Sequence, residues 1–250
     1  MSRRTQSKAF LKNGNLNTLV GLRYYCQNMI EADRTLVLVR HGQTNWNEEG
    51  RFQGRLDVPM NAFGWRQSFA VKSQLAGIPF DHAYSSPLHR ASDTARVITR
   101  EVPILKDPRL SEIHHGCWQG RTQREISRRR PDQWAQWREQ PWFTPEGGEP
   151  AAAVRSRVEE FLRSMRGRTI LCVSHGVIIQ NFLSILFGSS RSQDEVPANA
   201  SIHTLCFRNR QLCDYRFEMP TVAAVYDRRR FPNRLNFGGH RPPLQYEQNP

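Results

Sequence analysis

Residues 36–42 read LVLVRHG, and this stretch decides the fold because an apolar run stops abruptly at an arginine, a histidine and a glycine. Four consecutive apolar residues predict a strand that is covered on both faces of its sheet. Gly42 favours a sharp turn, so a rigid strand would hold Arg40 and His41 at its carboxyl end. Open α/β sheets bind their ligands at that edge, and we therefore place a candidate site there.

A second copy of this pattern lies at residues 169–176, which read TILCVSHG and precede an apolar helical stretch. Two such strands side by side would bring His41 and His175 together. The alternative is a structural role, since a single histidine at a strand end is more often a hydrogen-bonded structural residue than a catalyst. The motifs in the rest of the chain favour the functional interpretation.

The remaining sequence alternates short apolar strands with amphipathic helices. Asn61 can cap a helix that runs to Gly77, and Pro87 suits the first position of a helix that carries Arg90 in its opening turn. This alternation predicts an α/β protein, a three-layer α/β/α sandwich with a mostly parallel central sheet. The other predicted elements are strands at 81–85, 104–105 and 169–174, helices at 151–165 and 177–187, and a terminal hairpin at 202–207 and 212–217.

The composition is that of a folded protein, with 38% hydrophobic and 24% charged residues, but the net charge of +13 is large. A basic protein can bind nucleic acid, an anionic membrane or a phosphorylated substrate. Residues 1–33 and 226–250 each hold five basic against two acidic residues, and no strip of basic residues alternates with aromatic ones as in a base-stacking platform. No apolar run is long enough to span a bilayer. We therefore expect neither a nucleic-acid nor a membrane partner.

Four motifs occur in a fixed order along the chain. They are RHGQTNWN at residues 40–47, SSPLHRASDTA at 85–95, LSE with a following GCWQG at 110–120, and SHG at 174–176. In that order they resemble the histidine phosphatase superfamily, also called the phosphoglycerate-mutase-like family, over about residues 35–215. The resemblance implies a phosphoglycerate-mutase-like fold and phosphoryl transfer without a cofactor.

Phosphoryl transfer needs a nucleophile, positive charge around the equatorial oxygens and a proton for the leaving oxygen. The resemblance makes His41 the phosphohistidine residue and Glu112 the proton donor, and a partly desolvated pocket would raise the pKa of that carboxyl group. Arg40 and Arg90 carry guanidinium forks that match phosphate oxygens, and His175 adds a third donor. The resemblance thus gives each of the three requirements to a specific residue.

A further group of residues would bind the substrate or its phosphate, namely Asn47, Gln53, Gly176 and Val177. The chain departs from the family pattern at three positions. Gln119 stands where relatives commonly have Glu, while Val177 and Gln180 stand where many have Gly and Arg. These departures concern the substrate contacts and leave the core chemistry intact. The spacing of His82, His89, His114 and His115 matches no familiar metal site, and we expect no metal.

The connection between Glu112 and His175 bears on the type of reaction. It comprises residues 113–174, which are 62 in number, whereas mutases carry a long insertion there. The short connection favours a phosphatase of the broad-specificity and α-ribazole-phosphatase branch, acting on phosphate monoesters of small metabolites. Two alternatives stay open, phosphoglycerate-mutase-type phosphoryl transfer and a non-catalytic, anion-binding pseudoenzyme. Five intact core positions argue against the pseudoenzyme.

Four large aromatic residues fall in the segment 121–150, where relatives build the wall over the substrate. Trp134 and Trp137 are three apart on a predicted helix, so they either pack that helix onto the domain or face the site. Trp142 and Phe143 lie between prolines in a loop, where packing demands less. We expect this loop to line the mouth of the site and to favour a bulky apolar or aromatic leaving group.

The ends of the chain differ in composition from its middle. We predict one catalytic domain over residues 34–225, a flexible N-terminal extension at 1–33 and a basic C-terminal extension at 226–250. A transit-like leader and a mis-assigned start, with Met29 as an internal start, stay open as alternatives for residues 1–33. The N-terminus lacks the apolar core of a secretory signal, and five scattered cysteines form no paired motif, so we expect a cytoplasmic protein. A homodimer stays open.

Overall fold

A computed structural model describes residues 33–140, 143–187 and 196–222. Most of the predicted N-terminal extension, including Met29, lies outside these residues, as do Trp142 and the whole of 226–250. In the part of the chain that the structure describes, no helix is both long and apolar enough to cross a membrane.

A six-stranded sheet forms the centre, in the order β3-β2-β4-β1-β5-β6. The pairs β1–β4, β2–β4 and β2–β3 are parallel, whereas β5 runs antiparallel to β1 and to β6. The sheet is therefore mixed but mostly parallel, as predicted. The strands are β1 (Arg34–Arg40), β2 (His82–Ser85), β3 (Ile104–Lys106), β4 (Thr169–Ser174), β5 (Ile202–Arg208) and β6 (Gln211–Glu218).

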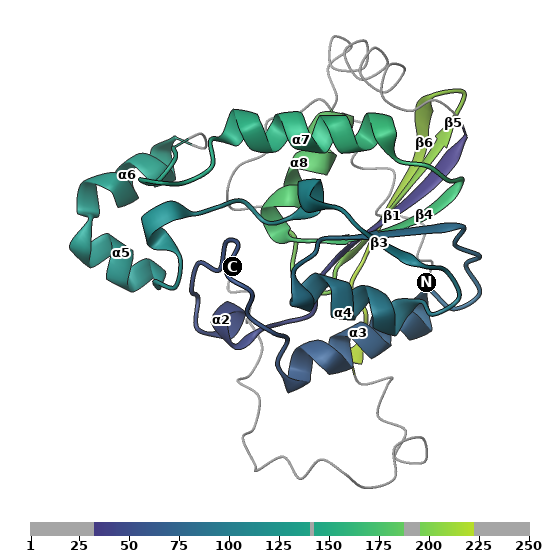
Figure 1. Ribbon diagram of the computed structural model, residues 1–250, viewed down its shortest axis with the longest axis horizontal. Helices are drawn as coiled ribbons and strands as arrows, with labels where there is room; N and C mark the ends of the chain where they lie inside the picture. The colour runs from purple at the N-terminus through teal and green to yellow at the C-terminus, as the bar shows by residue number, and fades with distance from the viewer. Residues whose placement is uncertain (1–32, 141–142, 188–195, 223–250) are drawn as a thin grey trace, which may run out of the picture.

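Helices cover both faces of this sheet, which makes the three-layer sandwich (Figure 1). Leu36 and Leu38 of β1 belong to the core cluster that α7 and α8 close. Val37 and Val39, which alternate with them, belong to a second cluster with α3 and α4. All four side chains are fully buried, which accounts for the continuous apolar run of this strand. The helices are α3 (Ala62–Gln74), α4 (His89–Ile98), α7 (Ala151–Ser164) and α8 (Gly176–Phe187).

The segment between β3 and α7 forms a lobe beside the carboxyl ends of the strands, at the left of Figure 1. Its helix α5 begins with a capping box, in which Thr122 and Glu125 bond each other's backbone N–H groups. Pro131 occupies the first turn of α6, where a missing N–H costs nothing. The lobe comprises the short 3₁₀ turns η1 (Pro108–Leu110) and η2 (Gly116–Trp118) with α5 (Gln123–Arg129) and α6 (Pro131–Glu139), and the four-residue α2 (Asn45–Glu48) follows β1.

Two local predictions need correction. Helix α4 begins at His89 and not at Pro87, because Leu88 is still extended, although Arg90 does lie in the first turn. Gly42 has no left-handed backbone, so a sharp turn is not why glycine stands there. A Cβ atom on Gly42 would lie 2.3 Å from the carbonyl oxygen of Gly64, and one on Gly64 would lie 2.1 Å from that of Gln43. The segment after β1 therefore packs backbone to backbone against the start of α3.

Candidate active site

The carboxyl ends of β1 and β4 place the two predicted histidines in contact. Arg40 pairs with Ser174 in the parallel register, and the His41 N–H continues the ladder to the Ser174 carbonyl at 3.0 Å. The ring centroids of His41 and His175 are 5.0 Å apart in an edge-to-face arrangement. The adjacency that the two strand motifs predict is thus present in the fold.

His41 is held as a neutral imidazole in one orientation. Its Nδ1 lies 2.7 Å from the carbonyl oxygen of Gly42, which requires the proton on Nδ1 and leaves the lone pair on Nε2. Burial, followed by the charges of Arg90 and Arg40, holds the pKa of His41 well below 6.5. An uncharged ring with a free Nε2 is the form that can attack phosphorus.

His175 has the opposite arrangement, since its Nε2 is the bonded nitrogen. That atom lies 2.8 Å from the Ser86 hydroxyl, and the buried Nδ1 has no partner among the described residues. Burial, with the charge of Arg90 next, holds the pKa of His175 well below its ordinary value. Ser86 lies in the second motif but is not among the predicted site residues, because a sequence does not reveal which side chain a residue at a strand end contacts.

The two arginines are anchored by backbone carbonyls, Arg90 as a buried cation and Arg40 as a partly buried one. Arg90 is 1% exposed and donates from its terminal nitrogens to the carbonyl oxygens of Leu56 and Gly54, both at 2.8 Å. Burial lowers the pKa of Arg90 to about 10, and Glu112 opposes this shift, so the guanidinium is charged at neutral pH. Arg40 donates to the carbonyl oxygen of Pro197. The buried Nε atoms of both arginines lack partners among the described residues, as expected of a site prepared for an anion.

Glu112 faces these cations from the segment that follows η1. Burial raises the pKa of its carboxyl group, while the N–H groups of Ile113 and Val177 and the charges of Arg40 and Arg90 oppose that rise. The Ile113 N–H donates to Oε1 at 3.0 Å. A partly buried carboxyl group with a raised pKa, near the charges of two arginines, is suited to give up a proton and take it back.

An ion-pair network around Glu149, which is not among the predicted site residues, holds the segment that carries Glu112 in place. The Glu149 carboxylate accepts two hydrogen bonds from Arg157, at 2.9 and 3.0 Å, and pairs with Arg55 at 3.0 Å. Arg55 in turn donates to the Glu112 carbonyl oxygen at 3.4 Å, and the Glu149 N–H donates to the His114 carbonyl at 2.8 Å. Glu149 therefore links α7, the loop after β1 and the segment that carries the acid.

These groups open into a cavity of about 680 Å³. Of the residues predicted to form the site, His175 and Gly176 do not line it and pack behind Arg40 and His41. A Cβ atom on Gly176 would lie 2.5 Å from Cγ1 of Val196 and 3.3 Å from the Arg40 guanidinium carbon, so a larger residue there would have to displace these side chains. The predicted residues that do line the cavity are Arg40, His41, Asn47, Gln53, Arg90, Glu112 and Val177.

Asn47 and Gln53 differ in how far they are free to bind a substrate. The Asn47 side-chain oxygen caps α2 by accepting from the Thr44 N–H at 3.1 Å, and it also accepts from Asn199 at 3.2 Å. Gln53 is buried, and its Oε1 has no partner among the described residues. Of the two amides, Gln53 is therefore the better placed to bind a ligand in the cavity.

Aromatic rings form the opposite wall of the cavity. Trp134 and Trp137 stack at 5.0 Å, and both line the cavity while packing against the buried Trp118 behind them. These two tryptophans therefore both pack α6 onto the domain and face the cavity. The wall also contains His115, whose pKa burial lowers to about 4, so that its ring is neutral. The other aromatic residues of the wall are Trp46, Phe52 and Phe143.

The fold and this arrangement define an α/β protein with a cationic cavity at the carboxyl ends of its parallel strands. The model of the family described as "Histidine phosphatase superfamily (branch 1)" matches residues 36–213, so the chain belongs to that superfamily. A phosphoserine phosphatase 1 of Hydrogenobacter thermophilus is 35% identical over 165 residues, which are 63% of this chain and 78% of the relative.

Two further relatives bear on the type of reaction. A 2,3-bisphosphoglycerate-dependent phosphoglycerate mutase of Rhizobium etli is 37% identical over 164 residues, 59% of this chain and 77% of the relative. The crystal structure of a putative α-ribazole-5′-P phosphatase from Escherichia coli is similar in fold, with a TM-score of 0.65 over 75% of this chain and 95% of that chain. The two sequences are 25% identical. Both phosphatases and mutases are therefore among the relatives.

Proposed function

We propose that the protein is a phosphatase that hydrolyses phosphate monoesters of small metabolites through a phosphohistidine on His41. The observation that carries this proposal is the state of His41, a neutral imidazole whose Nδ1 is bonded to the Gly42 carbonyl and whose pKa is lowered by burial and by the charges of Arg90 and Arg40. The guanidinium groups of Arg40 and Arg90 supply the positive charge that phosphoryl transfer requires.

The proposed reaction has two steps. In the first, Nε2 of His41 attacks phosphorus, the ester P–O bond breaks, and Glu112 gives its proton to the leaving oxygen. In the second, the Glu112 carboxylate takes a proton from water, the water oxygen attacks phosphorus, and the P–N bond breaks to release phosphate and restore His41. Because Glu112 loses and regains one proton, the protein returns to its starting state.

A quench experiment tests the intermediate directly. Enzyme mixed with a ³²P-labelled phosphate ester and quenched during turnover should carry acid-labile, base-stable label on His41. The His41→Ala variant should carry none, whereas His82→Ala, which changes a half-exposed histidine at the far end of β2, should be labelled like the wild type. Label that survives acid would show a different nucleophile.

Hydrolysis is favoured over mutase-type transfer by the segment between Glu112 and His175, which forms the aromatic wall and contains no long additional insertion. The mutase alternative rests on the phosphoglycerate mutase relative and predicts that 3-phosphoglycerate receives the phosphoryl group from labelled enzyme. We expect labelled enzyme to release inorganic phosphate instead, with 3-phosphoglycerate remaining unlabelled. Turnover of p-nitrophenyl phosphate would exclude the pseudoenzyme.

The aromatic wall supports a proposal about the leaving group. Its rings present apolar surface to the cavity, so a substrate with a flat or bulky apolar group gains contact area that a small sugar acid lacks. We infer no metal requirement, because arginines supply the charge, and we expect activity to survive EDTA. A cytoplasmic location and a homodimer stay proposals, the latter open to gel filtration.

A further inference from the structure

Two segments that lie far apart in the chain meet at Arg90. The carbonyl oxygens of Gly54 and Leu56 each accept a hydrogen bond of 2.8 Å from its terminal nitrogens, and both belong to the loop 54–57. Arg90 itself directly follows His89, the first residue of α4. The orientation of the guanidinium group therefore depends on how this loop is held against the start of the helix.

A carboxylate at the surface, Asp57, joins the loop to the helix. Its Oδ1 accepts from the His89 N–H at 2.7 Å, and its Oδ2 lies 2.5 Å from Nδ1 of the His89 ring. His89 directly precedes Arg90, and Asp57 ends the loop, so these two bonds lie next to the two that hold the guanidinium group. The loop and the start of α4 are thus connected at both the front and the back of Arg90.

We propose that Asp57 is a positioning residue, which fixes the loop 54–57 on α4 and thereby sets the orientation in which Arg90 meets the substrate phosphate. The inference rests on the proposed function, because it assigns the phosphate group to Arg90. Asp57 does not line the catalytic cavity, so it acts through the arginine. The buried Nε of Arg90, which has no partner among the described residues, is a donor left for the phosphate.

This role goes beyond that of an ordinary helix cap. The N-cap residue of α4 is Leu88, whose side chain forms no capping bond, and Asp57 takes over that task from a different segment of the chain. His89 is 63% exposed and Asp57 is 37% exposed, and an exposed ion pair contributes little to the stability of a fold. We therefore expect its removal to affect the orientation of Arg90 more than the folding of the domain.

The charge of Asp57 acts against its effect on geometry. Burial lowers the pKa of Arg90 to about 10, and the charges of Glu112 and Asp57 oppose this shift, so the charge of Asp57 is felt at the site. A nearby negative charge weakens the binding of an anion, and its removal alone should strengthen phosphate binding. Loss of positioning should instead weaken phosphate binding. Because the two effects have opposite signs, a binding measurement separates them.

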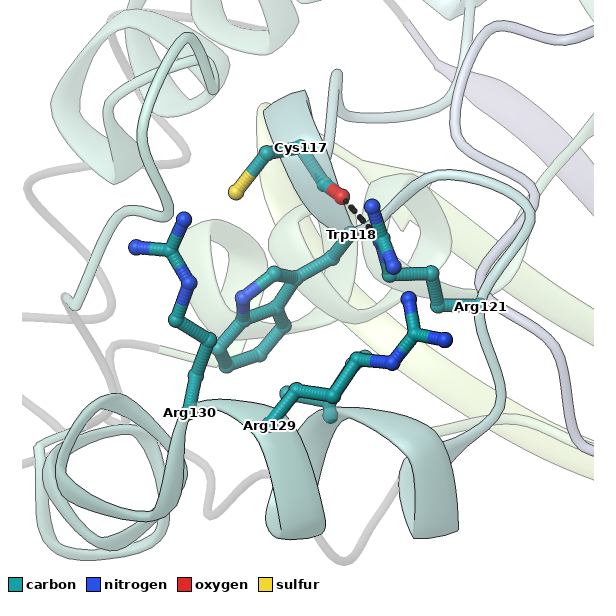
Figure 2. A pocket seen from close by; sticks show the side chains of 6 residues that line it. Cys117, Trp118, Arg121, Arg129 and Arg130 are labelled. Carbon is teal, nitrogen blue, oxygen red and sulfur yellow. Dashed lines mark hydrogen bonds between the residues drawn. The ribbon is translucent and has the colours of Figure 1, made fainter.

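NMR relaxation of the arginine Nε–H groups measures the positioning directly. The order parameter of the Arg90 Nε–H should be about 0.85 in the wild type and below about 0.6 in Asp57→Ala. Arg121 is the reference within the same spectrum, because its Nε donates to the Cys117 carbonyl oxygen at 2.9 Å (Figure 2) and it does not line the catalytic cavity. Its order parameter should be the same in both proteins. An equal loss at both arginines would show general loosening and overturn the proposal.

Calorimetric titration with inorganic phosphate measures the consequence for binding and requires no turnover. Asp57→Ala should bind phosphate about 10-fold more weakly than the wild type. Asp57→Asn keeps an oxygen for the His89 N–H and should recover most of this loss, while His89→Ala removes only the ring bond and should show a smaller loss. The matched control is Asp93→Ala, which removes a carboxylate paired with Arg96 on the same helix and should bind phosphate like the wild type.

The outcomes separate this inference from the proposed function. An unchanged order parameter of Arg90 in Asp57→Ala, or phosphate binding as tight as or tighter than in the wild type, would overturn the role of Asp57 and leave the proposed function intact. Equal affinities of Asp57→Asn and Asp57→Ala would also overturn it, because charge alone would then explain the effect. A wild type that binds no phosphate would overturn the proposed function, and this inference with it.

Discussion

The two ends of the catalytic cavity are built by different means. At the phosphate end, strand ends and backbone carbonyls fix buried cations and a neutral imidazole, as for Arg90 on Leu56 and Gly54. At the aromatic end, rings from α6 and the adjacent loops meet by packing alone, as for Trp134 on Trp137. From this difference we infer that the phosphate end recognises a substrate by the positions of its charges, whereas the aromatic end recognises it by shape. We expect changes at the first to affect every substrate and changes at the second to discriminate among them.

The largest effect should come from the proposed nucleophile. His41→Ala should lower kcat/KM by about 10⁴-fold or more for every phosphate ester, because the proposed intermediate forms on this residue. Initial rates with p-nitrophenyl phosphate and with an alkyl phosphate measure this loss. A loss confined to one of the two esters would contradict the distinction between the two ends of the cavity, since the phosphate end would then discriminate between leaving groups.

Glu112→Gln should come next and should depend on the leaving group. The amide keeps the shape but holds no proton to give, so we expect a loss of about 10²- to 10⁴-fold for an alkyl phosphate. p-Nitrophenyl phosphate, whose leaving oxygen hardly needs a proton, should lose far less. Equal slowing of both esters in a steady-state assay would assign Glu112 another role.

The pH dependence should follow from the two perturbed groups. The pKa of Glu112 is raised, so its carboxyl group stays protonated to a higher pH than an ordinary glutamate, and the rate with an alkyl phosphate should fall as pH rises through that raised value. The pKa of His41 is lowered, so the nucleophile becomes protonated only well below 6.5, where the acid limb should lie. In Glu112→Gln the fall at higher pH should disappear, and its persistence would assign that limb to another group.

Glu149→Gln tests how firmly the phosphate end is held. Removal of the charge that pairs with Arg55 and Arg157 should loosen the segment that carries Glu112, and we expect about a 10-fold lower kcat for an alkyl phosphate with KM little changed. The matched control is Glu159→Gln on α7, which also loses two ion pairs but lies away from the cavity. A similar loss in both variants would reduce Glu149 to a general stabilising role.

The smallest effect should come from the aromatic end. Trp137→Ala removes one ring of the stacked pair Trp134–Trp137. We expect kcat/KM for an aryl phosphate to fall about 10-fold, which is equivalent to about 1–2 kcal/mol of lost contact. The rate with 3-phosphoglycerate should change little. An equal loss for both substrates, or a wild type that prefers 3-phosphoglycerate, would show that the wall selects nothing.

A sequence predicts which residues lie at the strand ends more readily than which side chains those residues contact, for a physical reason. The carboxyl ends of neighbouring parallel strands meet at one edge, so the repeated strand motif was enough to predict that His41 and His175 lie together. Ser86 beside His175, and Glu149 between Arg55 and Arg157, join segments far apart in the chain. Such contacts depend on side-chain directions in space, and no periodicity or local propensity encodes them.

The contact between Gly42 and Gly64 sets a limit for anyone who wishes to redesign this enzyme. Where two backbones touch, even one methyl group has nowhere to go, so a library that randomises either position should yield folded members only with glycine. The aromatic wall, built from side chains, can in contrast be rebuilt one ring at a time. New specificities should therefore be sought in the segment 113–150, with the junction of β1 and α3 left as it is.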